Sequence, residues 1–201
     1  MQLEMKLETD DISRYLEASE IIDFHTSAEV AELSRKIFAR SADEIIFIKN
    51  AYEFVRDMIS HSNDIGADAV TCNASEVLRA RHGVCYAKSH LLAAILRCGS
   101  VPTGLCYQRL ILDDELHPYL VLHGLNAVYI RKKWIRLDAR GNKPGVDAQF
   151  SVEEERLAFP VRAEKGEENI PIIFAVPNNN IIEELTRCKS RNELWQNLPR
   201  E

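Results

Sequence analysis

The chain has 201 residues, of which 46% are apolar and 28% are charged, so it can bury a core and has the composition of a soluble globular protein. We expect a single domain over residues 1–201 with its core at about residues 51–145. The net charge of −6 argues against nucleic acid or an anionic membrane as the main partner, because both require a basic face.

The N-terminal residues and the cysteines predict the compartment. Residues 1–8 lack the basic start and the apolar run of a signal peptide, and no apolar stretch of the sequence is long enough to span a bilayer. The five cysteines are odd in number and widely spaced, and none forms a CxxC pair. This pattern indicates reduced thiols without a structural zinc site. We therefore expect a cytoplasmic protein that needs no metal or cofactor.

The first third of the chain predicts helices. Capping-box spacings begin at Thr26 and at Ser41, and each is followed by apolar residues at helical spacing. Residues 63–66 have the composition of a loop. Asn73 is expected to cap a short helix over residues 74–81.

The next helix is expected over residues 84–98. It is apolar on most of its sides, which predicts a buried position at the centre of the fold, and Pro102 prevents its continuation. From Thr103 onward the apolar period changes to two, and residues 119–130 and 133–139 predict a β-hairpin.

The last part of the chain mixes strand and helix signals. Residues 162–169 predict a surface loop, and residues 170–176 predict a strand that Pro171 confines to an edge or to a strand start. Helices are expected after Asn178-Asn179-Asn180 and after Ser190. Helices followed by antiparallel strands predict an α+β fold.

Cys85 follows Gly83 and Val84 at the first turn of the expected buried helix. There its sulfur would lie near unpaired backbone N–H groups and the positive end of the helix dipole, which favour a thiolate. The same N–H groups could face an oxyanion, and Gly83 would leave room for a substrate backbone. The alternative is that Cys85 is one more small, buried apolar residue.

His123 and Asp138 are brought to one face if Arg131-Lys132 forms a two-residue turn. In that register Asp138 lies opposite Leu125, and its side chain is a diagonal neighbour of the His123 side chain. Arg-Lys lacks the glycine or asparagine that such turns prefer. Taken alone, His123 could be an ordinary strand histidine and Asp138 a strand-end carboxylate. Together with Cys85 they form a nucleophile, a base and a group that orients the base.

These segments resemble the transglutaminase-like superfamily, a branch of the papain-like cysteine enzymes. Three motifs carry the resemblance in order: Gly83-Val84-Cys85 before a leucine-rich helix and Val101-Pro102, His123 before Asn126-Ala127-Val128-Tyr129, and Trp134 before Asp138. Leu125 stands where the family usually has an aromatic residue, and the family's glycine in the hairpin turn is missing.

The resemblance implies a papain/transglutaminase-like core in which N-terminal helices and a buried nucleophile helix pack on an antiparallel β-sheet. It implies that Cys85 is the nucleophile, His123 the general base and acid, and Asp138 the residue that holds the imidazole. The implied reaction is acyl transfer from an amide through a thioacyl-enzyme.

Other residues are candidates for substrate binding or for an oxyanion contact. The resemblance places His61 and Asn63 near a polar helper of the family, while His82 is expected at the rim of the site. Gly83 and Val84 directly precede the nucleophile. We expect the walls of the substrate groove to come from the N-terminal helices, residues 107–119 and the C-terminal tail.

Three functions compete. The first is hydrolysis of a peptide, isopeptide or glutamine-type amide in a peptide, protein or small-molecule partner. We favour it over crosslinking, because animal crosslinking members of the family are large and calcium-dependent and this sequence has no recognisable calcium loop. The second is a transglutaminase-like binding module without activity. The third, less favoured, is a metal site built from Cys85, His123 and Asp138.

Overall fold

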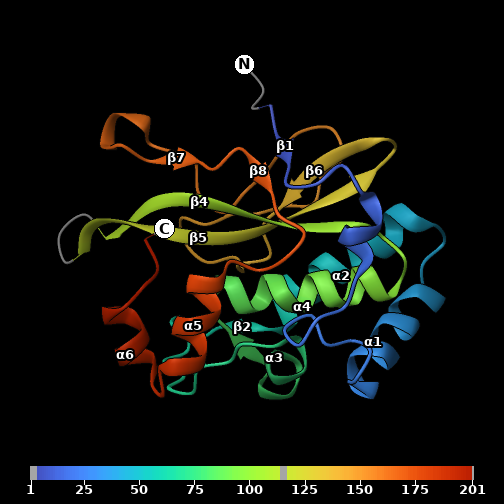
Figure 1. Ribbon diagram of the computed structural model, residues 1–201, viewed down its shortest axis with the longest axis horizontal. Helices are drawn as coiled ribbons and strands as arrows, with labels where there is room; N and C mark the ends of the chain where they lie inside the picture. Colours follow the sequence, from blue (N-terminus) through green and yellow to red (C-terminus); the bar gives the residue numbers. More distant parts are fainter. Residues whose placement is uncertain (1–3, 114–116, 201) are drawn as a thin grey trace.

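The computed structural model describes residues 4–113 and 117–200. They form an α+β fold in which the helices gather on one side of an antiparallel sheet (Figure 1). In chain order the helices are α1 (Ala28–Ala39), α2 (Glu44–Met58), α3 (Ala74–Ala80), α4 (Cys85–Cys98), α5 (Asn179–Arg187) and α6 (Arg191–Gln196), with 3₁₀ turns η1 (Ile12–Leu16) and η2 (Ala163–Lys165). The predicted fold class is confirmed.

The main sheet has the strand order β6-β5-β4-β7, and all of its neighbouring strands are antiparallel. Its strands are β4 (Thr103–Asp113), β5 (His117–Ile130), β6 (Lys133–Leu137) and β7 (Glu168–Asn169). Two short parallel pairs accompany it, β1 (Lys6–Leu7) with β8 (Ile172–Ile173), and β2 (Ser60–His61) with β3 (His82–Gly83).

Helix α4 lies at the centre of the fold, as its sequence predicts. Every residue from Tyr86 to Arg97 is buried. The helix is in contact with the sheet through β4 and β5, and with α1, α2 and α3 on its other sides. A helix that is surrounded in this way cannot shift without disturbing the whole core, so it is a rigid support for a residue at its first turn.

The β5–β6 hairpin has the register that the sequence predicts. Ile130 pairs with Lys133 and Asn126 with Leu137, so Arg131 and Lys132 form a two-residue turn. Both turn residues have left-handed backbones, with φ of +50° and +63°. The turn therefore forms without the glycine or asparagine that usually occupies such positions.

Two helix starts differ from the prediction. Ser27 caps α1 instead of Thr26, and Asp43 caps α2 instead of Ser41. The reason is that the hydroxyl groups of Thr26 and Ser41 are engaged elsewhere. Thr26 donates to the carbonyl of Asp23, and Ser41 donates to a carbonyl in the last turn of α1. The cap at Asn73 is confirmed, and α6 begins after Ser190 as predicted. Helix α5 begins at Asn179 with Asn178 as its cap, earlier than predicted.

Residues 162–169 are more ordered than the predicted surface loop. They contain η2 and the strand β7, which pairs with Gln108 and Arg109 of β4. Glu167 is buried here, where it accepts hydrogen bonds from the Arg162 side chain and the Ile111 backbone N–H. The strand predicted over residues 170–176 is reduced to β8, which begins directly after Pro171.

The described residues also bear on the predictions for disulfide bonds and for membrane-spanning helices. All five cysteines are free thiols, as their spacing predicts. Within residues 4–113 and 117–200, no helix is long and apolar enough to cross a membrane.

Candidate active site

Cys85 is the first residue of α4 and follows Val84, the N-cap residue. The first hydrogen bond of this helix runs from Lys88 N to Val84 O, at 3.0 Å, so the preceding N–H groups of the turn have no acceptor within the helix. The half-buried Cys85 lines a cavity of about 460 Å³. Its Sγ accepts a hydrogen bond from Gly124 N of β5, at 3.5 Å.

Gly124 allows strand β5 to approach the start of α4. A Cβ at this position would lie 2.8 Å from Tyr86 Cδ1, closer than real Cβ atoms approach, and 3.1 Å from Tyr86 Cα, which is a tight contact. The Tyr86 hydroxyl donates to the carbonyl of Leu122 on the same strand. The absence of a side chain at Gly124 therefore sets how near the thiol comes to the neighbouring His123.

His123 and Asp138 form a buried pair. His123 Nε2 lies 2.8 Å from Asp138 Oδ2, and the two residues are 2% and 1% exposed. Backbone N–H groups hold the carboxylate from two further directions: Ala158 N donates to Oδ2 and Arg140 N donates to Oδ1, each at 3.1 Å. Because Nε2 is engaged by Asp138, the Nδ1 side of the ring is left for Cys85.

The charges around the imidazole favour its protonated form. Burial lowers the pKa of His123, but Asp138 and a negative charge on Cys85 outweigh it and raise the pKa well above the ordinary value of 6.5. For Asp138, burial raises the pKa, whereas His123 and the N–H donors at its two oxygens hold it below its ordinary value. The imidazole thus lies between two groups that stabilise an imidazolium.

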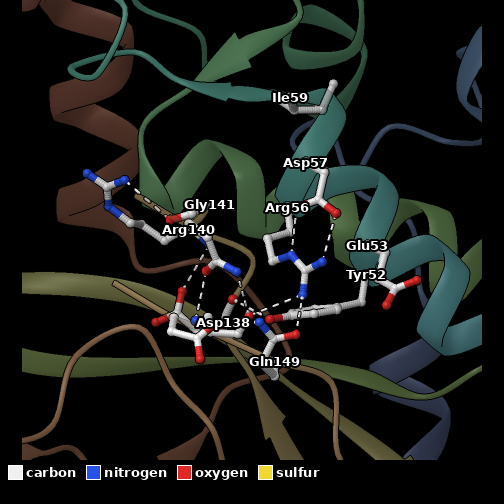
Figure 2. A network of polar contacts seen from close by, with 12 residues as sticks. Tyr52, Glu53, Arg56, Asp57, Ile59, Asp138, Arg140, Gly141 and Gln149 are labelled. Atoms are coloured by element: carbon white, nitrogen blue, oxygen red, sulfur yellow. Dashed lines mark hydrogen bonds and ion pairs between the residues drawn. The ribbon is translucent and has the colours of Figure 1, made fainter. Parts of the chain in front are cut away.

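Aromatic side chains fix the pair from outside the three motifs. The Phe159 ring meets the His123 ring edge to face, with centroids 5.1 Å apart. The Tyr52 hydroxyl of α2 donates to the carbonyl of Asp138 at 3.1 Å, beside Arg56, which contacts Asp57 and Gln149 (Figure 2). The orientation of the pair is therefore determined by α2 and by the segment around Phe159.

Lys88 ties α4 to the end of α2. It is 1% exposed, and its Nζ donates to the carbonyls of Ile59 and Arg56. Burial and the nearby Arg140 lower the pKa of Lys88 to about 7. The contact joins the helix that bears Cys85 to the helix that supports Asp138.

The cavity is lined by a mixture of apolar, basic and other polar residues. Its walls from β4 and from the C-terminal tail agree with prediction, although residues 114–116 of the predicted segment 107–119 lie outside the described residues. The expectation for the N-terminal helices is wrong, since α1 and α2 contribute no lining residue among those described; residues 140–162 do so instead. The lining residues are His61, Asn63, Val84, Cys85, Tyr86, Leu110, Ile111, Leu112, Leu122, His123, Arg140, Lys143, Phe159, Pro160, Arg162, Glu167, Trp195 and Leu198.

His61 and Asn63 both line the cavity. The pairing of β2 with β3 places His61 beside Gly83, two residues before the thiol. Its buried Nδ1 has no hydrogen-bond partner within the described residues. Burial, followed by the positive charge of Arg140, lowers the pKa of His61 to about 3, so its ring is neutral. Asn63 accepts a hydrogen bond from Arg191 at 3.0 Å.

Of the three candidate residues that directly precede Cys85, one lines the cavity and two do not. Val84 lines the cavity, but Gly83 and His82 do not. Gly83 does not leave room for a substrate; a Cβ there would lie 3.2 Å from both Ala87 Cβ and Thr71 Oγ1 in the protein interior. His82 Nδ1 lies 3.0 Å from Ser62 Oγ.

A metal centre does not fit the three motif residues. The imidazole of His123 stands between the thiol and the carboxylate, so the three groups do not converge on one point. Among the described residues, no group of three or more His, Cys, Asp and Glu side chains is arranged to hold a metal ion.

Several residues of the site carry no sequence signal. Ala158, Phe159, Trp195 and Leu198 lie in segments without a motif, far from the reactive residues in sequence. Arg140 could have been noticed, because it follows Asp138 by two residues and a backbone N–H at that distance commonly binds an aspartate side chain.

The chain is similar to known proteins in sequence family and in fold. A family model described as the transglutaminase-like superfamily matches residues 31–139. No curated protein sequence matches the chain. A solved structure of a candidate cysteine protease from Cytophaga hutchinsonii superposes with a TM-score of 0.54 at 21% identity, over 66% of this chain and 43% of that one. The periplasmic domain of TgpA from Pseudomonas aeruginosa has a TM-score of 0.49 at 15% identity, over 64% and 48%. The chain thus spans less than half the length of these two structures.

We predict that Gly124→Ala slows the reaction of Cys85 with iodoacetamide about tenfold or more, because the added methyl group pushes β5 and the start of α4 apart. It should also destabilise the fold by about 1–3 kcal/mol through overpacking. The measurement is the alkylation rate at Cys85 by mass spectrometry, together with urea unfolding.

Gly104→Ala is the matched control. Its Cβ would lie 2.2 Å from Ile173 Cγ2, in the same sheet but away from the cavity. It should lower stability without changing the alkylation rate. Equal rates in Gly124→Ala and the parent protein would contradict the proposed importance of the contact.

Proposed function

Because this chain belongs to the transglutaminase-like superfamily, we propose that Cys85, His123 and Asp138 transfer the acyl group of an amide, with water as the preferred acceptor. One observation supports this most directly. The 2.8 Å contact of His123 with Asp138 orients an imidazole towards the cavity that the Cys85 thiol lines. A nucleophile, a base and an orienting carboxylate in one cavity are the requirements of thiol catalysis.

In the acylation step the Cys85 thiolate attacks the carbonyl carbon of the bound amide, and a C–S bond forms. The electron pair of the carbonyl moves onto oxygen and returns as the C–N bond breaks. His123, as imidazolium, gives its proton to the departing amine. Asp138 keeps the ring in position and stabilises its charge during the transfer.

In the deacylation step a water molecule attacks the thioester, and His123 takes a proton from it. The C–S bond breaks, a carboxylic acid leaves, and the thiolate–imidazolium pair is restored. A primary amine in the place of water would give a new amide and no net hydrolysis. We propose hydrolysis of a peptide, isopeptide or glutamine-type amide as the main reaction.

The oxyanion of each tetrahedral intermediate needs two donors in this scheme. The Cys85 N–H at the start of α4 is one, because it has no acceptor within the helix. We assign the second to His61, whose neutral ring lies on the cavity wall beside the β3 strand. A neutral imidazole carries one N–H and can donate it to an oxyanion.

We predict that Cys85→Ala and His123→Ala abolish release of amine from a library of peptide amides and glutamine peptides. Cys98→Ala, which removes a half-buried thiol at the far end of the same helix, is the control and should retain activity. In the parent protein, an added primary amine should be incorporated more slowly than the amide is hydrolysed. Faster incorporation would reverse the preference for water, and no turnover of any amide would favour the binding module.

We predict that Asp138→Asn lowers kcat/KM about 100-fold or more and moves the basic limb of its pH profile to lower pH. The imidazolium is needed to protonate the leaving amine, so activity falls as the pH rises through the pKa of His123. Asp138 contributes to raising that pKa. Removing the charge must therefore lower it. A basic limb at the parent position, measured over pH 6–10, would show that Asp138 does not act on His123.

We predict that His61→Ala lowers kcat about 100- to 1,000-fold with little change in KM, the range seen when one oxyanion donor is lost. His61→Asn keeps an N–H donor and should retain more activity. His82→Ala is the matched control, because His82 is bonded to Ser62 and does not line the cavity. A loss confined to KM would assign His61 to substrate binding instead.

A further inference from the structure

One edge of strand β5 is left without a strand partner beside the candidate active site. Strand β6 pairs with β5 only from Asn126 to Ile130. Nearer to the cavity, the Gly124 N–H on this edge faces the Cys85 sulfur. Two residues earlier, Leu122 N donates a hydrogen bond of 2.7 Å to the carbonyl of Pro199. The segment after α6 reaches the sheet at this point (Figure 1).

Residues 197–200 occupy this edge in the manner of a bound peptide. Leu198 is half-buried and lines the cavity that also holds Cys85. Pro199 is buried, and its carbonyl accepts the bond from Leu122. The Arg200 guanidinium lies 4.2 Å from the centroid of the Tyr119 ring. An apolar side chain in a pocket, combined with a backbone bond to a strand edge, is how extended peptides are recognised.

The attachment of this segment is weak for a strand. A single backbone hydrogen bond joins residues 197–200 to β5 in the described part of the chain. Pro199 has no N–H, so it cannot return a bond to the carbonyls of the edge. Two further polar bonds of the segment, from Asn197 N to Leu194 O and from Asn197 Nδ2 to Glu193 O, only close α6. A peptide that pairs through both its N–H and its carbonyl groups could replace it.

We propose that the β5 edge at Leu122 is a binding site for an extended peptide with an apolar residue, and that residues 197–200 compete with that peptide for it. The inference rests on the proposed function in naming the peptide as the substrate. The apolar side chain of the substrate takes the place of Leu198, and its backbone carbonyl takes the place of Pro199. A basic residue two positions after the apolar one gains the contact with Tyr119.

Competition within the chain sets the affinity for the outside peptide. A tethered segment acts at an effective concentration of roughly millimolar. The apparent dissociation constant of the peptide equals its intrinsic dissociation constant divided by the fraction of molecules whose edge is unoccupied. A change that weakens only the internal segment should therefore tighten binding of the peptide.

The experiment measures peptide binding in the full chain with Cys85→Ala, which cannot turn over. The probe is the acetylated and amidated peptide Gln-Asn-Leu-Pro-Arg with a fluorescent label, and the same residues in scrambled order serve as the negative control. Leu198→Asp places a charge in the apolar cavity wall and releases the segment. We expect the probe to bind about tenfold tighter to this variant than to its parent.

The matched control is Asn192→Asp, which adds the same charge on the exposed side of α6 and away from the cavity. It should bind the probe as the parent does. Hydrogen exchange gives a second readout, because Leu198→Asp should speed exchange of the Leu122 amide and the probe should slow it again. Arg200→Glu, which leaves the cavity wall intact, should act in the same direction by a few-fold.

Unchanged probe affinity and unchanged Leu122 exchange in both Leu198→Asp and Arg200→Glu would overturn the inference and show that the segment is a fixed wall. Equal binding of the scrambled peptide would also overturn it. Because Cys85→Ala lacks the nucleophile, these readouts do not depend on catalysis. Tighter binding of the probe without turnover of any amide by the parent enzyme would refute the proposed reaction and retain the peptide site.

Discussion

The contact between the start of α4 and strand β5 determines whether the site exists. The backbone of Gly124 lies against Tyr86, and this places the Cys85 sulfur within reach of the strand that bears His123. The Tyr86 hydroxyl fixes the same two elements at Leu122. Since α4 is buried on all sides, the contact cannot adjust by moving the helix. Small changes at this crossing are therefore transmitted directly to the distance between thiol and imidazole.

The second constraint is the cost of a buried carboxylate. A charge as deeply buried as that of Asp138 is tolerated only if its oxygens are paired and hydrogen-bonded. His123 supplies the pairing, and the backbone N–H groups of Arg140 and Ala158 supply the bonds. Ala158 lies beyond residues 31–139 that match the family model. The segment around Ala158 therefore stabilises the buried charge of Asp138, and its neighbouring residues also line the cavity.

The sequence predicts the parts of the site that follow regular geometry. The hairpin register followed from period-two counting through Arg131-Lys132, and it placed His123 and Asp138 on one face. The position of Cys85 followed from the apolar pattern of α4. The cavity wall from residues 140–162 could not be predicted in the same way, because this segment is irregular and its contacts depend on the whole fold. The caps of α1 and α2 were misplaced because the hydroxyl groups of Thr26 and Ser41 donate to backbone carbonyls outside those helix starts.

The early end of strand β6 links the chemistry to substrate recognition. If β6 continued to pair beyond Leu137, Asp138 would remain in the ladder and could not turn to accept bonds from Arg140 and Ala158. The same departure leaves this edge of β5 without a strand partner at Leu122 and Gly124, whose backbone N–H groups bond instead to Pro199 and Cys85. The orientation of the imidazole and the unpaired edge of β5 are therefore two consequences of one break in the sheet. An edge of this kind would be a liability for aggregation if it stayed bare. Leu198 and Pro199 cover the edge of β5 and leave the cavity beside Cys85 open. The edge is thus protected although the site is accessible.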